Sequence, residues 1–94
     1  MNREELFQGC RIIVQQVLEQ LDQKRTAEGF SLLIQQMQPV QDSIMELADG
    51  GFLFPEDIQQ LSKYLLQALE NKDAVLLYDV LKYALLDVLN QLLG

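Results

Sequence analysis

Few side chains in this sequence are suited to catalysis. The chain contains no histidine, the commonest general base and the commonest transition-metal ligand in proteins. Its single cysteine, Cys10, falls on an apolar stripe at helical spacing, and a buried thiol is unreactive. Ser31, Ser43 and Ser62 have no histidine to activate them as nucleophiles. We therefore expect no catalytic residue, no cofactor and no enzymatic activity.

A pattern that resembles a calcium site occurs around Asp49-Gly50, and it is incomplete. With Glu56, this pair imitates the second half of an EF-hand loop, in which a glycine is followed six residues later by a glutamate. The same register places Met45 and Leu47 where the loop requires oxygen ligands. We therefore expect no metal site.

One cluster of polar and aromatic side chains remains as a candidate binding site. It comprises Tyr78, Asp79, Lys82 and Tyr83. Asp79 and Lys82 are three residues apart, a spacing at which opposite charges pair on a helix surface. The cluster either recognises a peptide or protein, or it is an ordinary solvated ion pair.

The helix that carries this cluster is predicted over residues 73–93, with Asp73 as its cap. It is apolar over most of its circumference, so the rest of the chain or a second molecule must cover it. A membrane span is disfavoured because Asp79, Lys82 and Asp87 would each cost about 3 kcal/mol inside a bilayer. The N-terminus shows no signal-peptide pattern.

Apolar residues at alternating spacings of three and four predict two long amphipathic helices, over residues 3–25 and 27–49. The second contains Pro39, and because the apolar repeat continues through it, we expect one kinked helix rather than two. Gly50 is the expected C′ residue that ends this helix. A proline at a favoured first position begins a further helix over residues 55–71.

Together these elements predict an all-α fold. The expected form is an antiparallel four-helix bundle with a kinked second helix and a largely buried C-terminal helix, in one domain over residues 1–94. The C-terminal helix has more apolar surface than two neighbouring helices would cover. We therefore expect a homodimer or a partner surface on this helix, formed by Val75, Leu86, Leu89 and Leu93.

The loop before residue 55 contains three consecutive apolar residues, Phe52-Leu53-Phe54. Such a loop either closes the open end of the core or forms an exposed docking patch through Phe52 and Phe54.

The chain is acidic, with fourteen acidic and seven basic residues and a net charge of −7. A nucleic-acid-binding protein needs clustered Lys and Arg, and the basic residues here are scattered, so we expect no direct nucleic-acid binding. The acidity either serves solubility or attracts a basic partner. A lone cysteine cannot form an internal disulfide, which favours the reducing cytoplasm.

The stretch from Glu70 to Tyr83, ENKDAVLLYDVLKY, resembles a pattern found in short uncharacterised bacterial helical proteins. Its elements are an acidic residue, Lys-Asp, a Val-Leu-Leu core, and then Asp, Leu and Tyr. Ala84 departs from the pattern, because an acidic residue is expected after the tyrosine. The resemblance implies a small bacterial cytoplasmic protein encoded near motility genes, and it implies no activity and no catalytic residue.

The function expected from these features is protein–protein contact by a small, acidic, non-enzymatic protein, such as an adaptor or an export-chaperone-like protein. The alternative is an acidic regulator that binds a basic protein or mimics nucleic acid. Neither a membrane nor a small-molecule substrate is expected. The pattern does not explain why Gly9 and Gly29 occur inside predicted helices.

Overall fold

The computed structural model describes residues 2–94, and every regular element in that range is a helix. The elements are α1 (Arg3–Asp22), α2 (Thr26–Gln35), α3 (Met37–Asp49), α4 (Pro55–Asn71), α5 (Ala74–Asp79), the π-helix η1 (Val80–Leu86) and α6 (Asp87–Leu93). Because α5, η1 and α6 follow one another without a break, the described chain forms five helical rods. The predicted all-α fold is confirmed at this level.

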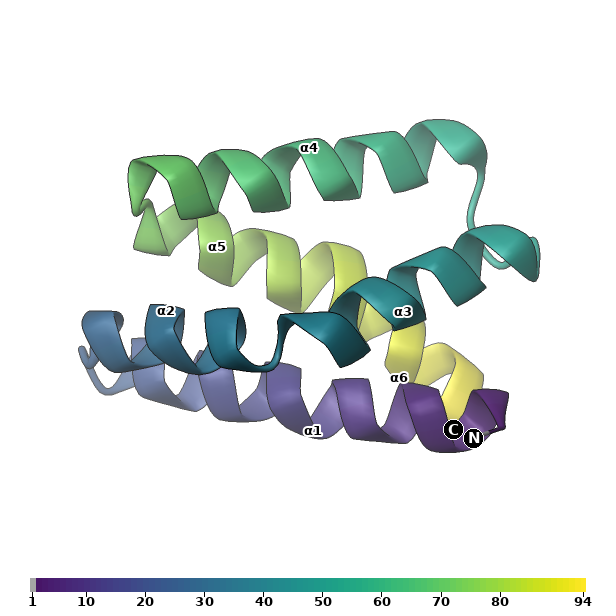
Figure 1. The fold of residues 1–94 in the computed structure, drawn as a ribbon, viewed down its shortest axis with the longest axis horizontal. Coiled ribbons are helices and arrows are strands. Elements are labelled where there is room, and N and C mark those ends of the chain that lie inside the picture. Colours follow the sequence, from purple (N-terminus) through teal and green to yellow (C-terminus); the bar gives the residue numbers. More distant parts are fainter. Residues whose placement is uncertain (1) are drawn as a thin grey trace.

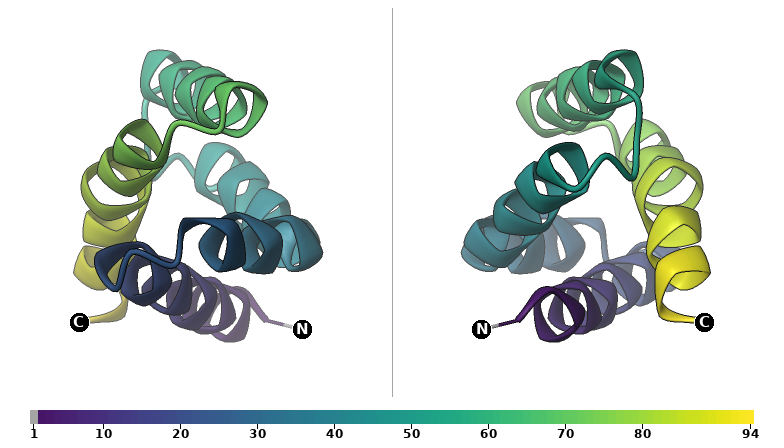
Figure 2. Two further views of the ribbon diagram at one scale, coloured as in Figure 1. Left: turned by 90° about the vertical axis from the view of Figure 1, so that its left-hand side faces the viewer. Right: turned by 90° about the vertical axis from the view of Figure 1, so that its right-hand side faces the viewer.

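The rods surround one core. In Figure 1, α1 and the α2–α3 pair run in opposite directions along one side, and α4 lies across the other side. The α5–α6 rod runs back from α4 towards α1, and the end-on views of Figure 2 show the rods around a common centre. α1 packs against α2 and α3 on one flank and against α5, η1 and α6 on the other. α4 packs mainly against α5 and η1, and it meets α3 over a shorter contact.

The core is built from the apolar stripes of all the rods, as the helical spacing predicts. α1 contributes Phe7, Cys10, Val14 and Val17, and the C-terminal rod contributes four fully buried leucines, Leu77, Leu81, Leu85 and Leu89. Burial of this apolar surface supplies most of the driving force for folding. The described helices include none long and apolar enough to cross a membrane.

The prediction of one kinked helix over residues 27–49 is wrong, because the chain forms two helices that are separated at Gln36. Pro39 explains the break. Its missing N–H leaves the carbonyl of Gln35 without a donor, and its ring clashes with that carbonyl in a continuous helix. In the observed structure Pro39 is the third residue of α3, where an N–H has no partner within the helix in any case.

Three helices end in the same way, with one residue in the left-handed conformation. These residues are Lys24 (φ 64°), Gly51 (φ 71°) and Lys72 (φ 51°). In each case the N–H of the following residue donates to the carbonyl five residues before it, as in a Schellman motif. These hydrogen bonds join Arg25 to Gln20 (2.8 Å), Phe52 to Leu47 (3.0 Å) and Asp73 to Ala68 (2.9 Å). The first helix therefore ends at Asp22 rather than at residue 25, and the C′ glycine is Gly51, not Gly50 as expected.

Side chains cap the starts of two helices, and one of them is Asp73, the cap expected from the sequence. The Asn2 side chain accepts a hydrogen bond from the Glu5 N–H (2.8 Å), and the Asp73 side chain accepts one from the Leu76 N–H (3.0 Å). Each side chain satisfies a donor that the helix itself cannot pair. α4 spans Pro55–Asn71, the range expected from the sequence.

The C-terminal rod differs from the expected regular α-helix, because residues 80–86 are π-helical. A π-helix uses hydrogen bonds from residue i to i+5, so each turn contains more residues than the 3.6 of an α-turn. The four buried leucines of this rod are each four residues apart. In a pure α-helix that spacing would rotate the last leucine by about 120° from the first. The wider turn counteracts this rotation and keeps all four leucines in the core.

Candidate functional site

The side chains that could act as nucleophiles are engaged in the core or isolated. Cys10 is fully buried, and burial raises the pKa of its thiol to about 11, although a hydrogen bond with Ser43 acts in the opposite direction. Ser43 is also fully buried, and its hydroxyl donates to the Leu6 carbonyl (3.4 Å). Within the described chain, no three His, Cys, Asp or Glu side chains are grouped so that they could hold a metal ion.

The candidate cluster on the C-terminal rod is centred on Lys82. Its ammonium group donates to the Tyr78 hydroxyl (3.5 Å) and lies 5.4 Å and 5.5 Å from the ring centroids of Tyr78 and Tyr83. The hydrogen bond to Tyr78 and the electrostatic influence of the ionisable Tyr78 and Tyr83 hydroxyl groups raise the pKa of Lys82 above its ordinary value. Asp79 is exposed next to this group, and Lys82 bonds Tyr78 instead of it. The three residues form a cation–aromatic cluster on the C-terminal rod.

The three apolar residues of the 52–54 loop have different environments. The Phe52 ring packs edge-on against Phe7, with centroids 6.0 Å apart, and the Arg3 guanidinium lies 5.0 Å from the Phe52 centroid. Leu53 is half-buried against the core. Phe54 is 74% exposed. Phe52 and Leu53 thus close one end of the core, and Phe54 alone is available at the surface.

The four residues expected to form a dimer surface do not lie on one exposed face. Leu89 is fully buried, and Leu86 and Leu93 are half-buried against the core. Val75 is 74% exposed at the start of α5. Of this set, Val75 alone offers a full side chain to another molecule.

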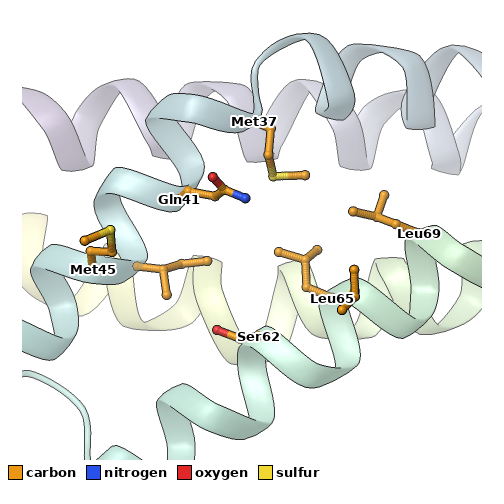
Figure 3. A pocket seen from close by; sticks show the side chains of 8 residues that line it. Met37, Gln41, Met45, Ser62, Leu65 and Leu69 are labelled. Atoms are coloured by element: carbon orange, nitrogen blue, oxygen red, sulfur yellow. The ribbon is translucent and has the colours of Figure 1, made fainter.

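A groove that the sequence reasoning did not identify lies between α3 and α4 (Figure 3). It encloses about 350 Å³ and is lined by Met37, Gln41, Ile44 and Met45 from α3 and by Ser62, Leu65, Leu66 and Leu69 from α4. Ile44 and Leu65 are buried and form its floor. Met45 and Leu66 form its edges and are 63% and 57% exposed.

The polarity of this groove is distinctive, because none of its lining residues is charged. Its polar groups are the Gln41 amide and the Ser62 hydroxyl, and Figure 3 shows both side chains beside the apolar ones. A neighbouring groove on the other side of α4, of about 270 Å³, differs in this respect because the charged residue Asp57 lines it, together with Tyr64 and Tyr83. The α3–α4 groove is the more apolar of the two surfaces that flank α4.

The groove forms because α3 and α4 contact each other over only a short length. The break at Gln36 lets α3 leave the direction of α2 and approach α4 near the 50–54 loop, as Figure 1 shows. The sequence contains one signal for it. Met45 and Leu66 are apolar residues that stand beside the core stripes rather than in them, and such off-stripe residues are expected where a helix has a second apolar neighbour.

Comparison with known proteins identifies one family. A family model described as a domain of unknown function (DUF8042) matches residues 4–93, which include nearly all of α1 and every later helix. No curated protein and no solved structure matches the chain. Because the match extends over almost the whole sequence, the chain belongs to the DUF8042 family of uncharacterised domains.

Proposed function

We propose that this protein is a non-enzymatic binding protein, and that its α3–α4 groove receives a helix of another protein. The observation that carries the proposal is the uncharged, apolar lining of that groove, with Met45 and Leu66 more than half exposed at its edges. Exposed apolar surface of this kind is costly in water and is typical of interaction sites.

The shape of the groove favours a helix over a small molecule. Two helices with an apolar trough between them accept the apolar face of a third helix, with anchors every three or four residues. A small-molecule site needs several convergent polar groups to orient the ligand. Here one amide and one hydroxyl line the groove, which favours an apolar helix face.

In this proposal the fold is a variant of an antiparallel four-helix bundle. Its second helix is divided into α2 and α3, and the α3–α4 groove is left open for the partner. An adaptor or export-chaperone-like role in the cytoplasm fits such a groove. From the resemblance of residues 70–83 to short uncharacterised bacterial proteins, we also propose a bacterial origin and a gene near motility genes.

The proposal is tested by site-specific photo-crosslinking in the cell that produces the protein. A photoreactive residue at position 66 faces the groove edge, and one at position 67 is the control, because Gln67 is an exposed neighbour on α4 that does not line the groove. We expect an adduct with another protein from position 66 and none from position 67. The adduct should disappear when Met45→Glu places a charge in the groove.

The same experiment separates the other occupants. An adduct with twice the mass of the chain would mean that a second copy fills the groove, as in the homodimer hypothesis. Absence of any adduct from position 66, with the variant folded by circular dichroism, would contradict the proposal.

The second candidate function is an acidic regulator that binds a basic protein or mimics nucleic acid through charge alone. The observation in its favour is that residues 26–62 contain six acidic residues and no Lys or Arg. The two candidates differ in their response to salt. An apolar groove should retain its partner at high ionic strength, whereas a purely charged interface should release it.

A further inference from the structure

We infer that the helix bound in the α3–α4 groove carries lysine or arginine beside its apolar stripe. This inference rests on the proposed function of the groove as a helix-binding site. It specifies the chemistry of the partner, and it is carried by the distribution of charge around the groove.

The acidic charge of the chain is concentrated on the elements that form the groove. Residues 37–71 comprise α3, the 50–54 loop and α4, and they contain six acidic residues and one basic residue, Lys63. The remaining residues contain eight acidic and six basic residues and sum to −2. The segment that forms the groove therefore contributes −5 of the total of −7.

Two cations of this region interact with side chains outside the groove. Lys63 follows the groove residue Ser62, and its ammonium group lies 5.8 Å from the ring centroid of Tyr64, which lines the groove on the opposite side of α4. Arg3 pairs with Glu46 (2.6 Å), which neutralises one of the six acids. Of the other acids, Asp57 lines the groove on the opposite side of α4, and Asp49 and Glu56 are exposed where α3 ends and α4 begins.

A basic helix is the partner that matches both features. Its apolar stripe would fill the uncharged groove, and its lysines or arginines would lie over the acidic surroundings, where opposite charges raise the association rate and suppress wrong partners. A second copy of this chain matches poorly, because each copy would bring its own net charge of −7 to the acidic side of the other.

The groove is also suited to variable apolar side chains. Met37 and Met45 stand at two places along α3, eight residues or about 12 Å apart, and methionine adapts to irregular neighbours. The complementary apolar stripe therefore needs only about two to three helical turns.

Three synthetic peptides test the inference, each of about 18 residues, a length that lets an amphipathic helix cover the groove. The first has leucine at helical spacing and lysine at the other positions. The second replaces every lysine with glutamate, and the third keeps the composition of the first with the leucine positions scrambled. Affinity for the full chain is measured by fluorescence anisotropy at low and high salt.

We expect the lysine peptide to bind at least about tenfold more tightly than the glutamate peptide at low salt, and the difference to shrink at high salt. Leu66→Gln should weaken its binding about tenfold, and Met45→Gln should act in the same direction. Val75→Gln is the matched control, because Val75 is exposed and lines a different groove, beside Leu21 and Thr26. Circular dichroism and thermal unfolding verify that each variant is folded.

The outcomes separate the two proposals. If neither amphipathic peptide binds, the helix-binding function fails and the inference fails with it. If the lysine and glutamate peptides bind equally well and Leu66→Gln weakens both, the groove binds helices and the inference about charge is overturned. If the scrambled peptide binds as tightly as the lysine peptide, or Val75→Gln acts like Leu66→Gln, binding is nonspecific attraction and the inference is also overturned.

Discussion

Two glycines inside helices have different surroundings. A Cβ atom added to Gly29 would lie 2.9 Å from Leu21 Cδ2 and 3.3 Å from Leu21 Cγ, so this glycine allows α2 to pack closely on α1. A Cβ atom added to Gly9 would meet nothing within 4 Å. The glycine is therefore needed for packing at position 29 and not at position 9.

This contrast gives a matched pair of variants. Gly9→Ala should raise the free energy of unfolding by about 1 kcal/mol, because alanine loses less backbone entropy in a helix and meets no neighbour. Gly29→Ala should gain less or lose stability, because the Leu21 side chain must move. Urea denaturation of both variants measures the difference, and an equal gain at the two positions would contradict the close packing at Gly29.

Cys10 should be protected from thiol reagents in the native protein. Burial raises its thiol pKa from 9.0 to about 11, which lowers the thiolate fraction at pH 8 about 100-fold, and the side chain is inaccessible. Labelling in buffer should therefore be at least about 100-fold slower than in urea. Equal rates would place Cys10 at the surface. The same shift should lower stability as the pH rises from 9.0 towards about 11, because the unfolded thiol ionises first.

At the scale of elements, the position of Pro39 within α3 determines the effect of removing it. As the third residue of a new helix, Pro39 breaks no hydrogen bond and restricts the unfolded chain, so Pro39→Ala should change stability by less than about 1 kcal/mol. In the interior of one continuous helix, the same substitution would stabilise by about 3 kcal/mol. Thermal and urea unfolding decide between the two, and a large gain would contradict the break at Gln36.

The elements that could be predicted from the sequence are those with marked ends. Asp73 and Pro55 have side chains whose chemistry defines a helix start, and α4 and the C-terminal rod begin where these residues indicate. The break at Gln36 was missed because the apolar repeat continues through it, and the local cost of Pro39 outweighs that repeat. The π-helix was missed because its leucines were read as an ordinary apolar surface, although their constant spacing of four differs from an α-helical stripe.

The candidate site was harder to predict than the helices. A stripe identifies the face of a helix that is buried, and a groove depends on how far apart two helices lie, which the sequence of neither helix specifies. Tyr78, Lys82 and Tyr83 do come together, because they are neighbours on one rod. Met45 and Leu66 come from different rods and meet through tertiary packing.

At the scale of the whole molecule, the helices have unequal support. α1 packs against rods on two flanks, whereas α4 packs mainly on α5 and η1 and leaves the α3 side partly open. Regions with fewer buried contacts open at a lower free energy than the core. The α4 helix is therefore expected to open locally before the rest of the fold.

Native-state hydrogen exchange tests this expectation. Amides of α4 around Leu65 should exchange with a lower opening free energy than amides of α1 around Val14, because Val14 is enclosed by more of the core. A ligand bound in the α3–α4 groove should slow exchange in α4 more than in α1. Equal protection of the two helices in the free protein would mean that the molecule opens as a single unit.

The π-helical segment has a consequence for the evolution of the family. It contains one residue more than a plain α-helix would need between Leu81 and Leu85 to keep the leucine stripe in the core. Deletion of one residue there would change the leucine spacings from four, four and four to four, three and four, which is the repeat of an ordinary α-helix. Relatives with a one-residue alignment gap between positions 81 and 85 should therefore share this fold, with a plain α-helix in place of the π-helical segment.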